Sequence, residues 1–397
     1  MKLYQYIKKG LIAGSIAVFA MCACQKNSDD QPNETENIQS STSDISQNTG
    51  EDEKQSQQDT DDNAQPDEMA DTQSTGESQT IADDESVSQD VFAMDTYMTV
   101  TAFGSHAKEA VEQAVAEINR LDALLSTGSA DSEVSKINQG QGTDLSEDTT
   151  YLLSRSLELY DSTDHVFNIA VYPLMEAWGF TSGNYKVPDQ TTLDDLLNYT
   201  DVSKINFNQE KASVEFDMEG MKIDLGGIAK GYTSIRIMDI YKACGVTSGL
   251  VNLGGNVQVL GTKTDGSAWR IGIQDPQDTE GYLGALSVVD KAVITSGGYE
   301  RYFEENGKTY HHIIDPATGY PAENGLISVT IVSADGTLAD GLSTSLFIMG
   351  KDKAIDYWQA HSDEFDMILM DDARGMYVSE GIVEDFASDL DYEVVTK

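Results

Sequence analysis

The sequence predicts an α+β fold, formed by a single domain over residues 91–397. Expected strands follow one another across short turns, as in "VNLGGNVQVLG" (251–261), which favours antiparallel pairing over a doubly wound parallel sheet. Helical segments with one apolar face lie between these strands. The composition also changes at Val91, because the preceding segment is acidic and lacks aromatic residues. The domain is therefore expected to begin there.

Residues 1–23 have the pattern of an export signal. Three lysines precede the apolar run Gly10–Ala20, which is too short for a stable membrane span. The run leads into "MCAC", where the small Ala23 precedes Cys24, as in a bacterial lipobox. We expect Cys24 to be diacylated, so that the mature chain is anchored in the membrane on the outer face of the cell. An ordinary cleaved signal or an uncleaved anchor is the alternative.

Residues 24–90 are expected to form a disordered acidic linker. Between Gln25 and Asp90 the sequence contains 19 acidic residues, 2 lysines and no aromatic residue. Such a segment cannot bury enough apolar surface to offset the chain entropy lost on ordering. Repulsion between its charges would keep it extended and hold the domain away from the membrane.

Charge and cysteine usage exclude several classes of function. The formal net charge is −43, and no basic patch is present, so nucleic acid is not expected as a partner. Cys244 is the single cysteine outside the signal and its lipobox. Neither an intramolecular disulfide nor a cysteine-rich metal site is therefore expected.

The domain opens with an expected strand at Val91–Phe103, where apolar and polar residues alternate. Residues 106–126 repeat apolar side chains at helical spacing, which predicts an amphipathic helix. Further helices are expected at Thr149–Ser162, Leu193–Tyr199, Ala229–Cys244, Ala339–Met349 and Lys353–His361. Further strands are expected at Ile205–Asn208, Ser213–Phe216, Gly249–Leu253, Asn256–Leu260, Arg270–Ile273, Leu283–Val289, Ala292–Thr295, Leu326–Val332 and Asp366–Met370.

The first candidate site segment is "IDLGGIAKGY" (223–232). Asp224 precedes a glycine pair and an expected helix start, and Lys230 lies in the first turns of that helix. Glycines let the backbone approach a ligand closely, and amides at a helix N-terminus attract phosphate. The alternative is a tight strand-to-helix connection with a surface lysine.

The second segment is "ADGLSTSLFIMG" (339–350), an expected buried helix. Asp340 and Thr344 are four residues apart and so share one face of it. A carboxylate and a hydroxyl form a hard oxygen pair, which suits Mg²⁺ if a backbone carbonyl and ligand phosphates complete the coordination. The alternative is that Asp340 caps the helix while Thr344 bonds back to a carbonyl.

The third segment is "HHIIDPATGYP" (311–321), with two adjacent histidines. Imidazole exchanges protons near neutral pH. If "HHIID" is a strand, successive residues point to opposite faces, so one histidine faces a cleft and the other faces away. The alternative is two partly exposed strand histidines with ordinary hydrogen bonds.

Taken together, these segments resemble the ApbE-type flavin transferases, which are FAD:protein FMN transferases. The resemblance covers nearly all of the chain after residue 90 and runs, in order, through "AMDTYMTV", "SEVSKIN", "FNIAVYPLMEAWGF", "DLGGIAKGY", "LVNLGGNVQV", "TSGGYERYF", "YHHIIDPATGYP" and "ADGLSTSLFIMG". It implies a single domain that binds FAD with Mg²⁺. It also implies transfer of FMN to a Thr or Ser hydroxyl of an extracytoplasmic protein, with release of AMP.

The resemblance also implies roles for individual residues. The metal would be held by the Asp340 carboxylate, the Thr344 hydroxyl and the Gly227 backbone carbonyl. The flavin or adenosine pocket would be lined by Met94, Val166, Phe167, Asn168, Asp224, Lys230 and Ile314. His312 matches the catalytic histidine, and a histidine with an ordinary pKa is a suitable base. Lys230 would stabilise negative charge that develops on the phosphate.

Three positions depart from the common pattern of these transferases: Asp95, Gly298 and Ala317. Two other functions remain open on the residues alone. The first is a Mg²⁺-dependent FAD pyrophosphatase, in which water is the acceptor and FMN and AMP are released. The second is a flavin-binding lipoprotein without catalytic activity, although such a protein would have no need of Asp340, Thr344 and His312 together.

Overall fold

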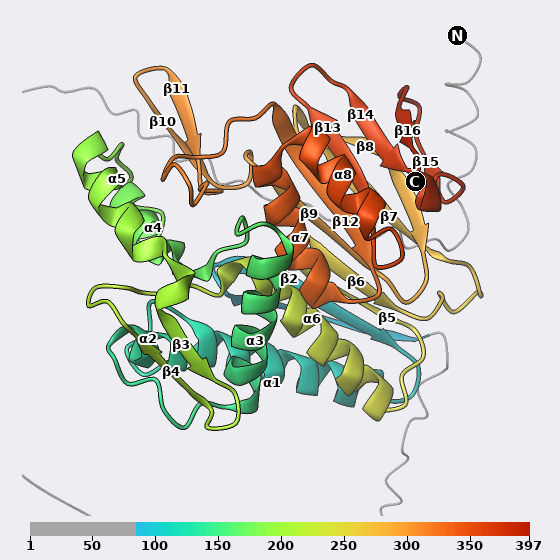
Figure 1. The fold of residues 1–397 in the computed structure, drawn as a ribbon. Coiled ribbons are helices and arrows are strands. Elements are labelled where there is room, and N and C mark those ends of the chain that lie inside the picture. Colours follow the sequence, from blue (N-terminus) through green and yellow to red (C-terminus); the bar gives the residue numbers. More distant parts are fainter. Residues whose placement is uncertain (1–84) are drawn as a thin grey trace, which may run out of the picture. The chain divides into compact units, whose positions relative to one another are not determined.

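A nine-stranded sheet forms the centre of the fold within residues 85–397, which are the residues that this computed structural model describes (Figure 1). In spatial order its strands are β1 (Ser86–Ala93), β2 (Thr96–Phe103), β5 (Gly249–Leu253), β6 (Asn256–Leu260), β9 (Ala292–Gly297), β12 (Leu326–Ser333), β13 (Asp366–Asp371), β14 (Met376–Ser379) and β16 (Glu393–Val395). Neighbouring strands are antiparallel, except that β14 and β16 are parallel. The expected α+β class is therefore confirmed. The signal, Cys24 and the linker up to residue 84 lie outside the described residues.

Helices cover one face of this sheet. They are α1 (Ala107–Leu125), α6 (Gly226–Ala243), α7 (Gly336–Met349) and α8 (Lys351–Ala360). The opposite face packs against a three-stranded sheet of β15 (Phe386–Ala387), β8 (Asp278–Val288) and β7 (Trp269–Asp275). Successive side chains of a strand point to opposite faces of the sheet, so one strand contributes to both layers. Ile294 of β9 packs with the helices, and its neighbour Val293 packs toward the second sheet.

Shorter elements complete the domain. The remaining helices are α2 (Glu133–Asn138), α3 (Glu147–Ser162), α4 (Tyr172–Trp178) and α5 (Gln190–Leu196), with 3-10 turns η2 (Ile169–Val171), η3 (Leu197–Thr200), η4 (Val202–Lys204) and η5 (Glu380–Ile382). The remaining strands form two hairpins, β3 (Ile205–Asn208) with β4 (Ser213–Phe216), and β10 (Tyr302–Glu305) with β11 (Lys308–His311). Helices α2 and α4 were not expected, because six or seven residues are too few to show helical periodicity.

The expected strand Val91–Phe103 is wrong as a single element. It is a hairpin, in which β1 and β2 pair across Met94 and Asp95, whose φ angles are 49° and 59°. A two-residue hairpin turn of this kind needs positive φ at both central residues. The alternation of apolar and polar residues continues through the turn, so the pattern hides it. Strand β1 also begins at Ser86, which brings five residues of the expected linker into the sheet.

The expected strand through "HHIID" is also wrong. Strand β11 ends at His311, and Ile314 forms only an isolated bridge with Pro321. Strand β11 forms a hairpin with β10, and the turn of this hairpin contains Asn306 and Gly307, which both have positive φ. His312 therefore lies in a connection, and its orientation does not follow from strand alternation.

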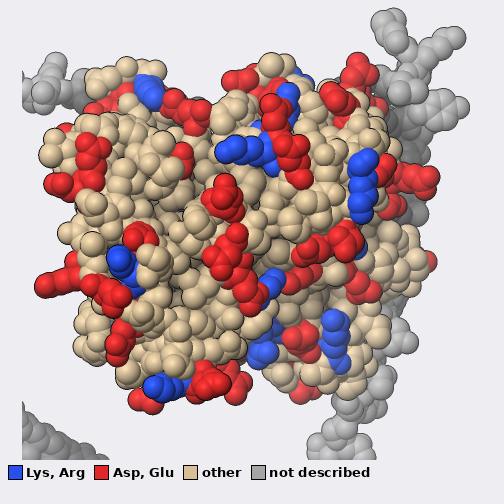
Figure 2. Space-filling model, viewed as in Figure 1, with Lys and Arg blue, Asp and Glu red and all other residues tan. Residues whose placement is uncertain are grey.

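No helix within residues 85–397 combines the length and the apolar character that crossing a membrane requires. The face shown in Figure 2 carries acidic side chains scattered among uncharged residues, with fewer lysines and arginines between them.

Candidate active site

Helices α6 and α7 touch through glycines. A Cβ atom on Gly231 would lie 2.1 Å from the carbonyl oxygen of Gly336 and 2.6 Å from the Cβ atom of Asp340. Position 231 does not tolerate a side chain, since non-bonded atoms do not approach so closely. This backbone contact brings the Asp340 side chain against the first turns of α6.

Asp340 is a buried carboxylate, 4% exposed, held by two neutral donors. The Gly231 amide donates to Oδ2 (2.8 Å) and the Asn256 side-chain amide donates to Oδ1 (2.9 Å). In a regular helix the amide of Gly231 pairs with the carbonyl of Gly227, so Asp340 is tied to the turn of α6 that contains Gly227. The N-cap of α7 is Asp335, which accepts from two main-chain amides, so the alternative role of Asp340 as a helix cap is wrong.

Thr344 lies one turn after Asp340 and is partly buried. Its hydroxyl is 3.4 Å from that of Ser296 at the end of β9, and Ser296 also bonds to Ser343 (2.8 Å). The site is thus formed where α6, α7 and the end of β9 meet. Figure 1 shows α6 and α7 lying next to each other, close to β9.

The oxygen atoms at this junction fit a hard divalent cation. Within residues 85–397 Asp340 has no ion-pair partner, and an uncompensated buried charge is costly unless a cation or several donors satisfy it. No group of three or more His, Cys, Asp and Glu side chains suited to a metal occurs in that range. A metal at Asp340 would therefore need hydroxyl, carbonyl and ligand oxygens, which is a set typical of Mg²⁺.

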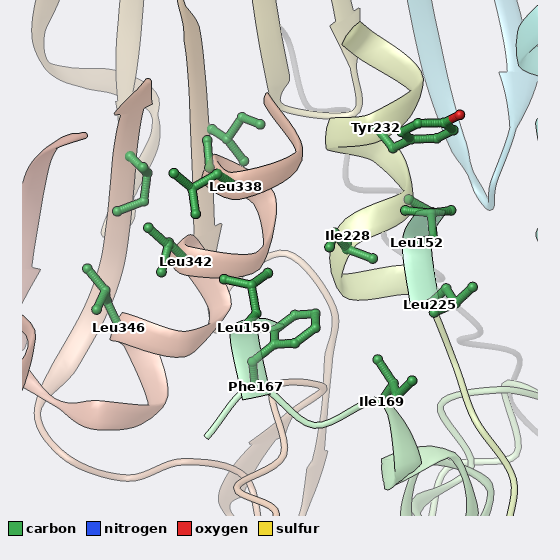
Figure 3. Packing of buried hydrophobic residues seen from close by; sticks show 14 of the residues in the cluster. Leu152, Leu159, Phe167, Ile169, Leu225, Ile228, Tyr232, Leu338, Leu342 and Leu346 are labelled. Atoms are coloured by element: carbon green, nitrogen blue, oxygen red, sulfur yellow. The ribbon is translucent and has the colours of Figure 1, made fainter. Parts of the chain in front are cut away.

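Phe167 packs between the two helices. A Cβ atom on Gly227 would lie 3.4 Å from its ring, and one on Gly341 would lie 3.5 Å from it. Figure 3 shows Phe167 beside Leu159, with Ile228 of α6 on one side and the leucines of α7 on the other. Its backbone amide donates to the Thr163 hydroxyl (3.0 Å). The segment after α3 is therefore fixed against the junction.

The neighbours of Phe167 connect this segment to the start of α6. The Asn168 side chain donates to the Thr200 carbonyl (2.8 Å) and accepts from the Ala170 amide (2.7 Å). The Asp224 amide donates to the Ile169 carbonyl (2.8 Å). The residues expected at the flavin pocket on both segments, which include Val166, are thus brought together from positions about 60 residues apart in sequence.

Met94 reaches α6 from the turn between β1 and β2. Its amide donates to Asp122 (2.9 Å), and its sulfur lies 3.9 Å from the Thr233 hydroxyl. Thr233 lies one turn after Lys230 on the same helix, so the hairpin turn borders the junction from another side.

Charged groups from three segments surround the start of α6. Burial raises the pKa of Asp224, although its bond to the Gly226 amide and the charges of Arg301 and Lys230 oppose that rise. Burial also raises the pKa of Glu300 to about 7. The negative charge of Asp340 raises this pKa as well, whereas the positive charges of Lys230 and Arg301 lower it. Two cations and three carboxyl groups therefore influence one another at this junction.

His312 faces the same cations. Its backbone amide donates to the Arg301 carbonyl oxygen (3.0 Å), and its Nδ1 atom lies within hydrogen-bond distance of the same oxygen (3.2 Å). Because a carbonyl only accepts, Nδ1 carries the proton, and the lone pair of Nε2 is left to accept another. Burial lowers the pKa of His312 to about 3, with Arg301, His311 and Lys230 adding to this effect. The expectation of an ordinary pKa is therefore wrong, because burial and nearby cations both disfavour the imidazolium ion.

Ile314 lies in a different core cluster, with Trp178 and Phe180 around α4, rather than with Phe167.

Two further residues are candidates for a functional role that the sequence did not indicate. Arg301 donates to the Phe180 carbonyl (2.7 Å) and holds His312 through its own carbonyl, and Asn256 holds Asp340. Both lie in segments that the sequence marks as unusual, "TSGGYERYF" and "VNLGGNVQV", but spacing alone does not show which residue acts.

Comparison with known proteins identifies the family. Residues 94–369, more than two thirds of the chain, match the ApbE family. The chain belongs to the ApbE family. An FAD:protein FMN transferase from Klebsiella pneumoniae is 36% identical over 253 residues, which cover 63% of this chain and 78% of that protein. One from Haemophilus influenzae is 32% identical over 270 residues, covering 65% and 77%.

Solved ApbE structures share the fold. The ApbE protein from Thermotoga maritima superimposes with a TM-score of 0.71 at 32% identity, covering 75% of this chain and 98% of that one. The flavin transferase ApbE from Vibrio cholerae gives 0.66 at 26% identity, covering 74% and 96%. The expected relationship to this family is therefore confirmed.

The structure shows the local environment of two residues that depart from the ApbE pattern. Asp95 occupies a positive-φ position where glycine is free of strain. At Gly298 a Cβ atom would lie 2.8 Å from Cδ2 of His311, so the neighbouring imidazole needs the absence of a side chain. Nothing in the structure explains Ala317, which is exposed.

Proposed function

We propose that this ApbE family chain is an FAD:protein FMN transferase that moves FMN from FAD to a Ser or Thr hydroxyl of an extracytoplasmic protein and releases AMP. The observation that carries the proposal is the arrangement of Asp340, Thr344 and His312 around the start of α6, where Lys230 and Arg301 supply positive charge. Relatives that carry this activity in their names support it.

Binding of FAD follows from the charges at the junction. The diphosphate of FAD is anionic, and Lys230 and Arg301 are the cations that shape the pKa of Asp224, Glu300 and His312. A Mg²⁺ ion held by Asp340, Thr344 and the Gly227 carbonyl would supply further stabilisation of negative charge on the phosphate oxygens. The fixed donors need no reorganisation as that charge develops.

His312 is proposed as the base. The acceptor hydroxyl gives its proton to Nε2 of His312, and its oxygen forms a bond to the FMN phosphorus. The bond from this phosphorus to the bridging oxygen breaks, and AMP leaves with that oxygen. The anionic diphosphate would offset the cations that now disfavour imidazolium, which raises the pKa of His312 toward the range useful for a base.

In-gel flavin fluorescence tests this proposal. The chain is incubated with FAD, Mg²⁺ and a flavin-accepting extracytoplasmic protein, and the acceptor is examined for covalent FMN after denaturation. Wild type should label the acceptor, and His312→Gln should not, while the variant keeps its affinity for FAD. A wild-type chain that leaves the acceptor unlabelled while a known relative labels it would refute the proposal.

Two other outcomes correspond to the alternative functions. Release of FMN and AMP at the same rate with or without acceptor would identify an FAD pyrophosphatase. Recovery of intact FAD in the presence of Mg²⁺ would identify a flavin-binding protein without catalytic activity. The clustering of Asp340, Thr344 and His312 favours catalysis over binding alone, since flavin binding does not need a base.

We further propose that the chain is a lipoprotein, anchored through Cys24 on the outer face of the cell membrane. The apolar run and the "MCAC" sequence support this proposal. Wild type should partition with membranes and carry acyl chains at Cys24 by mass spectrometry, and Cys24→Ala should not. An unacylated N-terminus in the wild-type chain would contradict it.

A further inference from the structure

His311 uses both nitrogens of its ring. Nδ1 lies 3.3 Å from the amide of Ile313, which can only donate, so Nδ1 is unprotonated. Nε2 lies 3.1 Å from the carbonyl of Ala322, which can only accept, so Nε2 carries the proton. The two bonds select one neutral tautomer and fix the plane of the ring. Burial lowers the pKa of His311, consistent with that neutral form, while Ala322 and Glu323 oppose the shift.

The ring is enclosed by elements of the candidate site. It meets Phe347 of α7 edge to face, with centroids 5.5 Å apart and planes at 89°. Phe347 comes three residues after Thr344 on the same helix. On another side lies Gly298, where a Cβ atom would approach the imidazole to 2.8 Å. His311 is thus packed between the helix that carries Asp340 and the connection that carries Glu300 and Arg301.

The same ring closes the base of the loop that follows it. Ala322, which accepts from His311, also donates from its amide to the Ile313 carbonyl (3.0 Å). Two residues later, Asn324 donates to the carbonyls of Phe347 (2.7 Å) and Ile348 (3.0 Å) at the end of α7. Both ends of the loop are therefore attached to α7, directly or through His311.

We propose that His311 is a positioning residue, which sets the catalytic imidazole of His312 relative to Asp340 and Thr344 on α7. This inference rests on the proposed function. His311 does not touch the reacting atoms. It acts by holding the backbone on both sides of His312, because the amide of Ile313 and the carbonyl of Ala322 cannot both be satisfied if the ring turns.

Substitution at position 311 separates positioning from folding. His311→Phe keeps an aromatic ring but removes both hydrogen bonds, and we expect kcat for FMN transfer to fall by about 10- to 100-fold with KM for FAD unchanged, as small displacements of catalytic groups do. His311→Asn keeps an acceptor for the Ile313 amide, and His311→Gln keeps a donor that reaches toward Ala322. Both should retain more activity than the Phe variant.

His361→Phe is the matched control. That histidine also bonds a carbonyl through Nδ1, that of Tyr357 (2.8 Å), and stacks on its ring at the end of α8. Its replacement should leave kcat unchanged. Wild-type kcat in His311→Phe, or equal changes in kcat and in KM for FAD in all three His311 variants, would overturn the proposal.

Gly298 gives a second and independent readout. Gly298→Ala should displace the ring and lower kcat in the wild-type background. In His311→Ala, which has no ring to displace, the added methyl group should cost nothing further, so the double variant matches the single one. Simply additive losses would overturn the proposed coupling. If wild type transfers FMN and these variants remain unaffected, this inference alone fails; if wild type transfers none, the proposed function fails.

Discussion

The Gly231 amide of α6 donates to the Asp340 carboxylate of α7 across a distance of 2.8 Å. This bond joins a main-chain amide of one helix to a side chain of the other. It is made only because Gly231 and Gly336 allow their backbones to touch. The position of the buried carboxylate therefore depends on helix packing as much as on the Asp340 side chain.

The charge of Asp340 is the first property to test. Asp340→Asn keeps the size of the side chain and an acceptor oxygen for Gly231 but removes the charge that a divalent cation requires. We expect flavin transfer to fall by at least about 100-fold, with little change in the circular dichroism spectrum. The control is Asp335→Ala, which removes the α7 cap and should cost about 1 kcal/mol of stability while transfer persists. Undiminished transfer by Asp340→Asn would remove this residue from its proposed role.

The close approach of α6 and α7 is tested at Gly231. Gly231→Ala places a methyl group where the Gly336 carbonyl oxygen lies, so the helices must separate. We expect a loss of about 1–3 kcal/mol in the free energy of unfolding and a marked loss of transfer activity. Gly128→Ala is the control, because the nearest atom there is 3.7 Å away. A Gly231→Ala chain with wild-type Tm and activity would show that the contact is not needed.

The partly buried carboxyl of Glu300 predicts a pH dependence of stability. Its pKa is raised to about 7 from 4.5 by burial, so between these values the folded protein binds a proton that the unfolded chain has released. Stability from this group is therefore lost as the pH rises through that range. Glu300→Gln should gain Tm relative to wild type between about pH 5 and about pH 8, with a ceiling of about 3 kcal/mol. The exposed Glu304→Gln is the control, and its Tm should differ from that of wild type by the same amount at every pH. If the Tm difference between Glu300→Gln and wild type were also independent of pH, Glu300 would not titrate in this range.

The turn between β1 and β2 carries strain that one substitution relieves. Asp95 has φ of 59°, a conformation that glycine adopts without strain. Asp95→Gly should stabilise the fold by about 0.5–1 kcal/mol, since the turn geometry favours glycine there. Thermal unfolding measures this, and a lower Tm would contradict the assignment of strain to Asp95.

The sequence predicts the site best where it depends on regular local geometry. The four-residue spacing of Asp340 and Thr344 places both on one helix face, as observed, because helical phase follows from local spacing. The sheet class also follows from short turns between strands. Spacing does not show that Asp335 rather than Asp340 caps α7, because both are carboxylates near the start of an apolar run.

Features that depend on tertiary contacts could not be predicted. The role of Arg301 rests on its backbone carbonyl, which carries no sequence signal, and on a bond to Phe180, 121 residues away. The low pKa of His312 likewise arises from burial and from cations on other segments. Residue type alone indicates an ordinary histidine, so only the assembled site shows the difference.

The most direct test is the stoichiometry of AMP released from FAD against FMN bound to the acceptor protein. With wild-type chain, Mg²⁺ and acceptor, we expect one AMP released for each FMN found on a Ser or Thr by peptide mass spectrometry, and almost no AMP without acceptor. Release of AMP and free FMN at the same rate in the absence of acceptor would contradict it.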